Sequence, residues 1–153
     1  MSAPTRRSRE AGATILEFAL VLMIFLTFLL GIMDFARMVG AWSAANESTR
    51  WGARTAVVCA QGAAAVLRNM QQFVPQLTGA NVQIDWYDAS GAVSTTCNAT
   101  SCAGVNVRIT ALNFRWISPI GYGIGPLIPM PSFSTYLPRE SMGQDPNSST
   151  VCS

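Results

Sequence analysis

Residues 6–33 read RRSREAGATILEFALVLMIFLTFLLGIM, a basic start followed by an apolar run on which the rest of the chain depends. Between residues 13 and 33 the only charged side chain is Glu17. A helix of this length rises about 30 Å, which matches the hydrocarbon core of a bilayer. A signal peptide has a shorter core that ends at a small-x-small site, and no Ala-x-Ala follows closely here. We therefore predict a membrane span at residues 13–33.

Glu17 lies near the start of this span, five residues after Gly12. Ionisable residues within spans are costly and are candidates for function. If the chain were cut after Gly12, Ala13 would carry a new positive amine, and Glu17 would lie one helical turn away, where an acid also offsets the helix dipole. These three residues are therefore predicted to act together. The alternative is that Glu17 only reaches the membrane interface, about 6 Å along the helix from Ala13.

Three short segments extend this pattern: GATILEFALVL at residues 12–22, GIMDFAR at residues 31–37 and RWGAR at residues 50–54. The first resembles the processing site of type IV pilin-like proteins, and together they are similar to the N-terminal region of TadE-like pseudopilins, minor components of the Tad (Flp-type) pilus. The resemblance implies that a membrane prepilin peptidase cuts between Gly12 and Ala13. It also implies that Glu17 and Phe18 serve assembly.

The resemblance further implies a minor pilin or pseudopilin that takes part in assembly, tip formation or adhesion of a surface pilus. Its partners would be the prepilin peptidase, other pilin or pseudopilin subunits, the inner-membrane pilus assembly platform and membrane lipid. Three arginines precede the span, so the positive-inside rule predicts a single-pass protein of the bacterial inner membrane, with a cytoplasmic N-terminus and a periplasmic head, able to enter a surface pilus. The alternative is a membrane-anchored envelope protein that is never processed.

Composition argues against several other functions. The net charge is +2, and removal of residues 1–12 would leave seven basic and seven acidic side chains, so no basic surface is expected to bind nucleic acid. Histidine is absent, which removes Ser-His-Asp and Cys-His arrangements and most catalytic zinc sites. Asp85 and Asp88 form a possible carboxylate pair, but aspartates at a strand end are usually turn formers. We expect no catalytic residue, cofactor or metal; an exported enzyme that uses carboxylates is the other alternative.

A periodic seam predicts that the helix continues beyond the span to about residue 58, for a length of about 70 Å. The seam consists of Phe35, Met38, Trp42, Ala45, Thr49, Gly52, Ala56 and Cys59. Close helix packing favours small side chains, so the seam packs either against neighbouring subunits or against the chain's own head. A further helical piece at residues 63–74 should end at Pro75.

The period then changes to that of strands. Residues 82–86 alternate between apolar and polar, and residues 93–97 can return as the second strand of a hairpin. Residues 105–111 are expected at the centre of a small antiparallel sheet, and residues 133–137 can add a last strand. Residues 118–131 hold four prolines and three glycines, which excludes a central strand or a regular helix. We expect them to form a lid over the sheet; the alternative is an exposed apolar patch for a partner.

Four cysteines follow the span and lie on the oxidising side in this topology, where disulfides persist. Three connectivities are possible. Cys97 and Cys102 enclose only four turn-forming residues, which favours a local bridge and leaves Cys59 to pair with Cys152. A zinc site is the alternative, but the usual paired Cys-x-x-Cys spacings are missing.

The predicted fold class is α+β and pilin-like, a long N-terminal transmembrane helix followed by a small antiparallel sheet head with disulfides. Its parts are a cytoplasmic leader without regular structure (residues 1–12), the transmembrane part of the helix (13–33), a periplasmic helical stem (34–74) and an antiparallel β head with a Pro/Gly-rich loop and a polar tail (75–153).

Overall fold

A computed structural model describes residues 7–59, 62, 64–97, 101–119, 121–125, 127–138 and 152. It shows the predicted α+β fold, in which a long apolar helix is followed by a small antiparallel sheet with two disulfides. The chain divides into two compact units. The first combines the long helix up to Arg37 with the segment Arg115–Leu127, and the second contains Met38–Phe114 and the chain from Ile128 onward.

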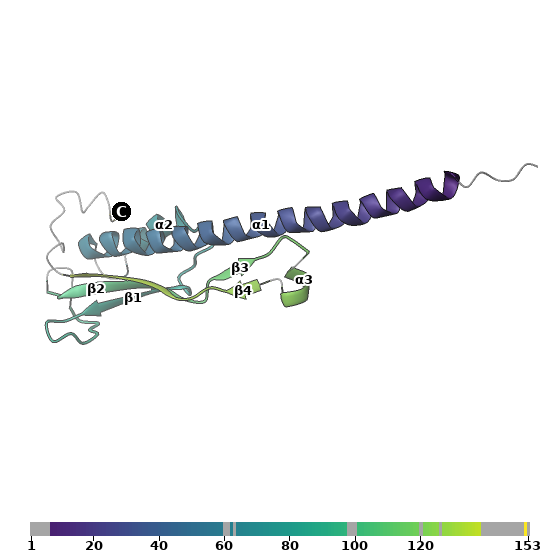
Figure 1. Cartoon of the computed structure of the whole chain (residues 1–153). Coiled ribbons are helices and arrows are strands. Elements are labelled where there is room, and N and C mark those ends of the chain that lie inside the picture. The colour runs from purple at the N-terminus through teal and green to yellow at the C-terminus, as the bar shows by residue number, and fades with distance from the viewer. Residues whose placement is uncertain are drawn as a thin grey trace, which may run out of the picture. The chain divides into compact units, whose positions relative to one another are not determined.

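Helix α1 covers Arg7–Val58 and runs through both units (Figure 1). Its end at Val58 confirms the prediction from the periodic seam. Its start differs, because residues 7–12 were expected to lack regular structure; residues 1–6 lie outside the described part. Arginine, glutamate and alanine are good helix formers, and no proline separates them from the apolar run. The helix therefore extends upstream of residue 13.

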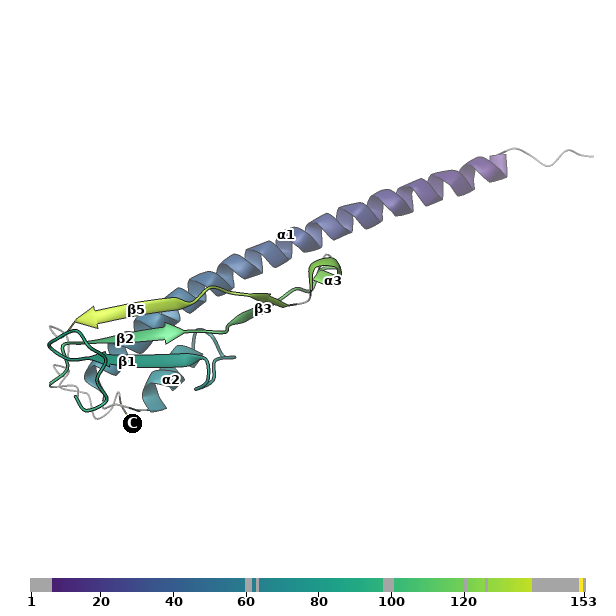
Figure 2. The same ribbon diagram turned by 90° about the horizontal axis from the view of Figure 1, so that it is seen from below.

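The three-stranded sheet lies in the second unit and has the strand order β1-β2-β5 (Figure 2). Its strands are β1 (Val82–Tyr87), β2 (Gly104–Ile109) and β5 (Phe133–Pro138), and both pairings are antiparallel. The predicted central strand and last strand are thus confirmed. The central strand buries alternate apolar side chains, which explains why its pattern was the clearest in the sequence.

The predicted hairpin strand at residues 93–97 forms only at its start. A bridge joins Val93 to Tyr87 and the amide of Ser94 donates to the carbonyl oxygen of Trp86 at 2.8 Å, but residues 94–97 are not a strand, and the strand partner of β1 is β2. Past Val93, the hydroxyl oxygen of Ser94 accepts hydrogen bonds from the amides of Thr96 and Cys97 at 3.3 and 3.4 Å. Such a serine turn takes the backbone out of an extended path.

The core of the second unit forms between α1, α2 (Ala64–Gln71) and the sheet. Its fully or almost fully buried residues include Ala45, Ala53, Ala56 and Val57 from α1, Val66 and Met70 from α2, and Val105, Val107 and Ile109 from β2. The seam from residue 45 to residue 59 therefore packs against the chain's own head. Phe35 and Trp42, further upstream, are 58% and 47% exposed. Helix α2 lies within the predicted piece at 63–74, and turn hydrogen bonds continue from it to Val74.

The Pro/Gly-rich stretch contains more structure than its composition suggested. A one-turn helix, α3 (Gly121–Ile124), precedes β4 (Leu127–Pro129), which pairs with β3 (Asn113–Arg115) in a separate two-stranded sheet. We expected residues 118–131 to pack over the sheet, but up to Leu127 they belong to the unit of the helix. The reason is Asp34 of α1, whose carboxylate accepts hydrogen bonds from the backbone amides of Ile117 and Ser118. From Ile128 onward the chain belongs to the unit of the sheet, and Met130 packs against its core.

Candidate processing and assembly site

The predicted processing residues all lie on the exposed N-terminal part of α1. A side chain at Gly12 would meet no atom within 4 Å. Ala13 and Glu17 are both exposed and are four residues apart, so they lie on the same face of the helix. Phe18 is 66% exposed. The helix thus places Gly12, Ala13 and Glu17 within about two turns, and all three positions are exposed among the residues that the structure describes.

The span that follows presents apolar side chains on all sides. Fifteen large hydrophobic residues between positions 13 and 33 are exposed, each by 40% or more of its surface. Within the described residues this is the one helix long and apolar enough to cross a membrane. The hydroxyl of Thr27 donates to the carbonyl oxygen of Met23 at 2.8 Å, so this polar group is satisfied within the helix. The surface therefore suits lipid or other apolar helices.

Asp34, directly after the span, is a residue that sequence reasoning missed. Its side chain is buried, with a residue exposure of 2%. One carboxylate oxygen accepts hydrogen bonds from the backbone amides of Ile117 and Ser118 at 3.0 and 2.6 Å. The other forms an ion pair with Arg37 at 2.7 Å. An acid at the end of an apolar run was the available signal, but the partner backbone 83 residues away was not visible in the sequence.

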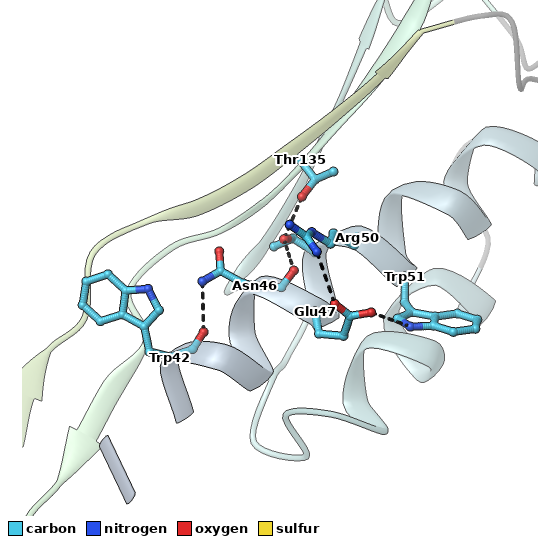
Figure 3. Close-up of polar contacts among 7 residues, drawn as sticks. Trp42, Asn46, Glu47, Arg50, Trp51 and Thr135 are labelled. Atoms are coloured by element: carbon cyan, nitrogen blue, oxygen red, sulfur yellow. Dashed lines mark hydrogen bonds and ion pairs between the residues drawn. The ribbon is translucent and has the colours of Figure 1, made fainter. Parts of the chain in front are cut away.

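A row of polar contacts follows along α1 in the second unit (Figure 3). Glu47 accepts a hydrogen bond from the indole nitrogen of Trp51 at 3.1 Å and forms an ion pair with Arg50 at 3.7 Å. The rings of Trp51 and Phe73 are stacked, with their centres 6.1 Å apart. The guanidinium carbon of Arg54 lies 5.7 Å from the centre of the Trp51 ring. Because the Glu47–Arg50 pair is exposed, it contributes little to stability, and among these contacts the aromatic one between Trp51 and Phe73 joins α1 to the segment after α2.

Both predicted cysteine pairs are bonded in the structure. Cys59 is joined to Cys152 and Cys97 to Cys102, and the described residues contain no free cysteine. Because all four sulfur atoms are in disulfides, these cysteines are not available as thiolate ligands for zinc.

The two aspartates considered as a carboxylate pair have structural partners. Asp85 forms an ion pair with Arg108 across β1 and β2 at 3.0 Å. Asp88 caps a turn, where hydrogen bonds from the Ser90 hydroxyl and the Ala92 amide hold its pKa below the ordinary value. Across the described residues, no cluster of three metal-ligating side chains occurs. Both carboxylates of the considered pair are therefore engaged in structural contacts.

Comparison with known proteins agrees with the geometry. Residues 12–54 match the model of a family described as TadE-like protein. This match confirms the resemblance predicted from the N-terminal segments, and it associates the helix with pilin-like proteins of Tad pilus systems, which are structural and not enzymatic. No curated protein and no solved structure matches the chain significantly.

Proposed function

We propose that this chain, whose residues 12–54 match the TadE-like family, is a minor pilin or pseudopilin of a Tad-type pilus. A prepilin peptidase cuts it between Gly12 and Ala13, and the mature subunit takes part in assembly, tip formation or adhesion of the pilus. The observation that carries the proposal is the surface of α1, which presents Gly12, Glu17 and a span whose large apolar side chains are each exposed by 40% or more.

The proposed topology follows from the charges around the span. Residues 1–12 form a cytoplasmic leader, residues 13–33 cross the inner membrane, and residues 34–74 and 75–153 form a helical stem and a head in the periplasm. Three arginines in the leader favour this orientation. In this position the leader meets the peptidase, the span meets lipid and other subunits, and the N-terminal part of the subunit can reach an assembly platform in the same membrane.

Cleavage after Gly12 requires local unwinding, because α1 is helical at this residue. Glycine in a helix interior costs about 1 kcal/mol relative to alanine. Its position near the start of the helix, where the backbone frays most easily, lowers the cost of an extended conformation further. The absence of a side chain also lets the backbone enter a narrow cleft. Gly12 therefore serves both the unwinding and the fit.

The first test replaces Gly12 by leucine and follows the mass of the product in cells that contain the peptidase. We expect the Gly12→Leu chain to keep residues 1–12. The matched control is Gly40→Leu, since Gly40 lies on the same helix and also has no atom within 4 Å of an added side chain; this variant should be cut normally. Undiminished cutting of Gly12→Leu at the same bond would contradict the proposal. A wild-type chain that keeps its leader would favour the unprocessed envelope anchor instead.

Glu17 is proposed to meet the amine of Ala13 on an adjoining subunit. In a low dielectric a charge pair gains strength, while a lone charge is heavily penalised. A subunit that docks in register is therefore favoured over one that is misplaced. The alternative, in which Glu17 only reaches the membrane interface, predicts that assembly does not need its charge.

The second test compares Glu17→Gln with Glu17→Asp, which keeps the charge. We expect Glu17→Gln to be inserted and cut but to be largely lost from purified pili, with partial recovery in Glu17→Asp. Normal cutting together with wild-type recovery of Glu17→Gln in pili would rule out the charge pair and leave the cleavage step untouched.

A further inference from the structure

The segment Arg115–Leu127, called here the interface loop, exposes apolar side chains although it belongs to the exported part of the proposed topology. Ile117 is 67% exposed and Leu127 is 56% exposed. The sequence from residue 116 to residue 138 contains no charged side chain, and arginines stand at both of its ends. A long uncharged stretch with exposed apolar residues marks a surface that meets something other than water.

Asp34 fixes the level of the interface loop along α1. Its carboxylate accepts hydrogen bonds from the backbone amides of Ile117 and Ser118, with nitrogen–oxygen distances of 3.0 and 2.6 Å. Because Asp34 directly follows the span, the loop backbone lies at the end of the apolar run. The interface loop, which contains α3, forms one compact unit with the helix up to Arg37.

The interface loop also forms a groove with the last turns of the span. This groove has a volume of about 430 Å³. It is lined by Thr27, Phe28, Gly31, Ile32, Phe35 and Trp116. Since residues 27–35 cover about 12 Å of helix, the groove extends from the end of the span back towards the bilayer core. It is continuous with a helix surface whose large apolar side chains are exposed.

We propose that the interface loop lies in the headgroup and acyl boundary of the bilayer leaflet on the head side, and that the groove holds a lipid acyl chain. This inference rests on the proposed membrane anchor. Interfacial segments bury their apolar face about 5–10 Å into this boundary, and tryptophan is enriched there. The groove beside Trp116 fits that depth, and so does the exposed Ile117, whose amide donates to Asp34 at the end of the span.

The proposal explains why an aspartate is buried at this position. Backbone amides near the hydrocarbon must be hydrogen-bonded, because an unsatisfied polar group there costs several kcal/mol. In the interface loop, α3 and the β3–β4 pairing bond part of the backbone. Asp34 accepts hydrogen bonds from two backbone amides that lie between β3 and α3, and the guanidinium of Arg37 balances the charge of Asp34.

The test places a diazirine-bearing phenylalanine at one position of the full chain and measures photo-adducts by mass spectrometry. The chain is reconstituted in vesicles of phosphatidylethanolamine and phosphatidylglycerol. The probe replaces Ile117 in the loop, Phe28 in the span or Val93 in the head. Phe28 is 69% exposed and Val93 60% exposed, so the three sites are matched in accessibility.

We expect the lipid-adduct yield at position 117 to approach that at position 28 and to exceed that at position 93 several-fold. If position 28 labels lipid while position 117 labels water or a second protein chain, the interface proposal is overturned and the membrane anchor stands. If position 28 also fails to label lipid, the anchor itself is wrong and the interface proposal falls with it. Neither result depends on cleavage or pilus assembly, which the tests at Gly12 and Glu17 address separately.

Discussion

Two stretches of α1 differ in the size of their apolar side chains and in whether these side chains are buried. Between residues 13 and 33 the large apolar residues are exposed, from 40% at Leu22 to 69% at Phe28. Between residues 45 and 59 the inward positions carry small residues, and Ala45 and Ala53 have no exposed surface. The first stretch has the composition of a core although its large side chains stay largely exposed, and the second stretch is covered by the sheet and α2.

This difference teaches where each stretch finds its partner. Large side chains gain most from removal from water, about 1.5–3 kcal/mol each when fully buried, so the exposed first stretch suits the membrane partner that we propose for it. Small side chains gain less but allow close approach of backbones. The backbone of α1 is helical in both stretches. The size of the side chains therefore suits the first stretch to an apolar surrounding and the second stretch to close packing on the head.

The largest expected effect tests the covered stretch through its terminal bridge. Cys59→Ser with Cys152→Ser opens a loop closed over 93 positions, which the chain-entropy estimate values at about 4–5 kcal/mol. Cys97→Ser with Cys102→Ser opens a loop closed over five positions, worth only about 2 kcal/mol. Urea denaturation of the full chain in detergent should rank the variants in this order. An equal loss in both would mean that the long bridge does not hold the head on the helix.

The next effect compares a covered glycine with an open one. An added side chain at Gly52 would lie 2.6 Å from the sulfur of Met70, which is itself fully buried, so Gly52→Leu should cost about 1–3 kcal/mol or more. Gly40→Leu meets no neighbour and should be neutral or stabilising by up to about 1 kcal/mol. The same denaturation measurement checks both, and a tolerated Gly52→Leu would contradict close packing here.

The smallest effect concerns the uncovered stretch. Phe18→Ala removes a large apolar side chain that is 66% exposed, so the stability of the head should change by less than about 0.5 kcal/mol. If Phe18 serves assembly, as proposed, the same variant should be recovered poorly in purified pili. A stability loss comparable with that of Gly52→Leu would show that the head covers this part of the helix after all.

The parts of the fold that follow a simple period could be predicted from the sequence. The end of α1 at Val58, the central strand β2 and the last strand β5 each follow from apolar spacing alone. The predicted hairpin strand at residues 93–97 does not continue beyond its start, because a serine turn competes locally with strand pairing and apolar spacing does not indicate such a turn. The prediction that residues 7–12 lack regular structure was wrong, because their small polar and basic residues were taken as a sign of an unstructured leader, whereas α1 begins at Arg7.

The candidate site divides in the same way. The spacing of Gly12 and Glu17 is local, so the sequence suffices to propose their roles, which remain predictions. Asp34 depends on backbone amides more than 80 residues away, and no local pattern indicates them. A contact between a side chain and distant backbone carries almost no sequence signature, because any residue other than proline supplies the amide.

The bridge between Cys59 and Cys152 has a mechanical consequence. When a folded segment is pulled at its two ends, it lengthens by separating those ends. These two cysteines hold the ends of the head segment at a Cα distance of 5.4 Å. The 93 positions between them would otherwise release roughly 300 Å of extended chain under tension. Force that enters through the helix and leaves near Cys152 therefore passes through a covalent link, and the sheet bears none of it until that link is reduced.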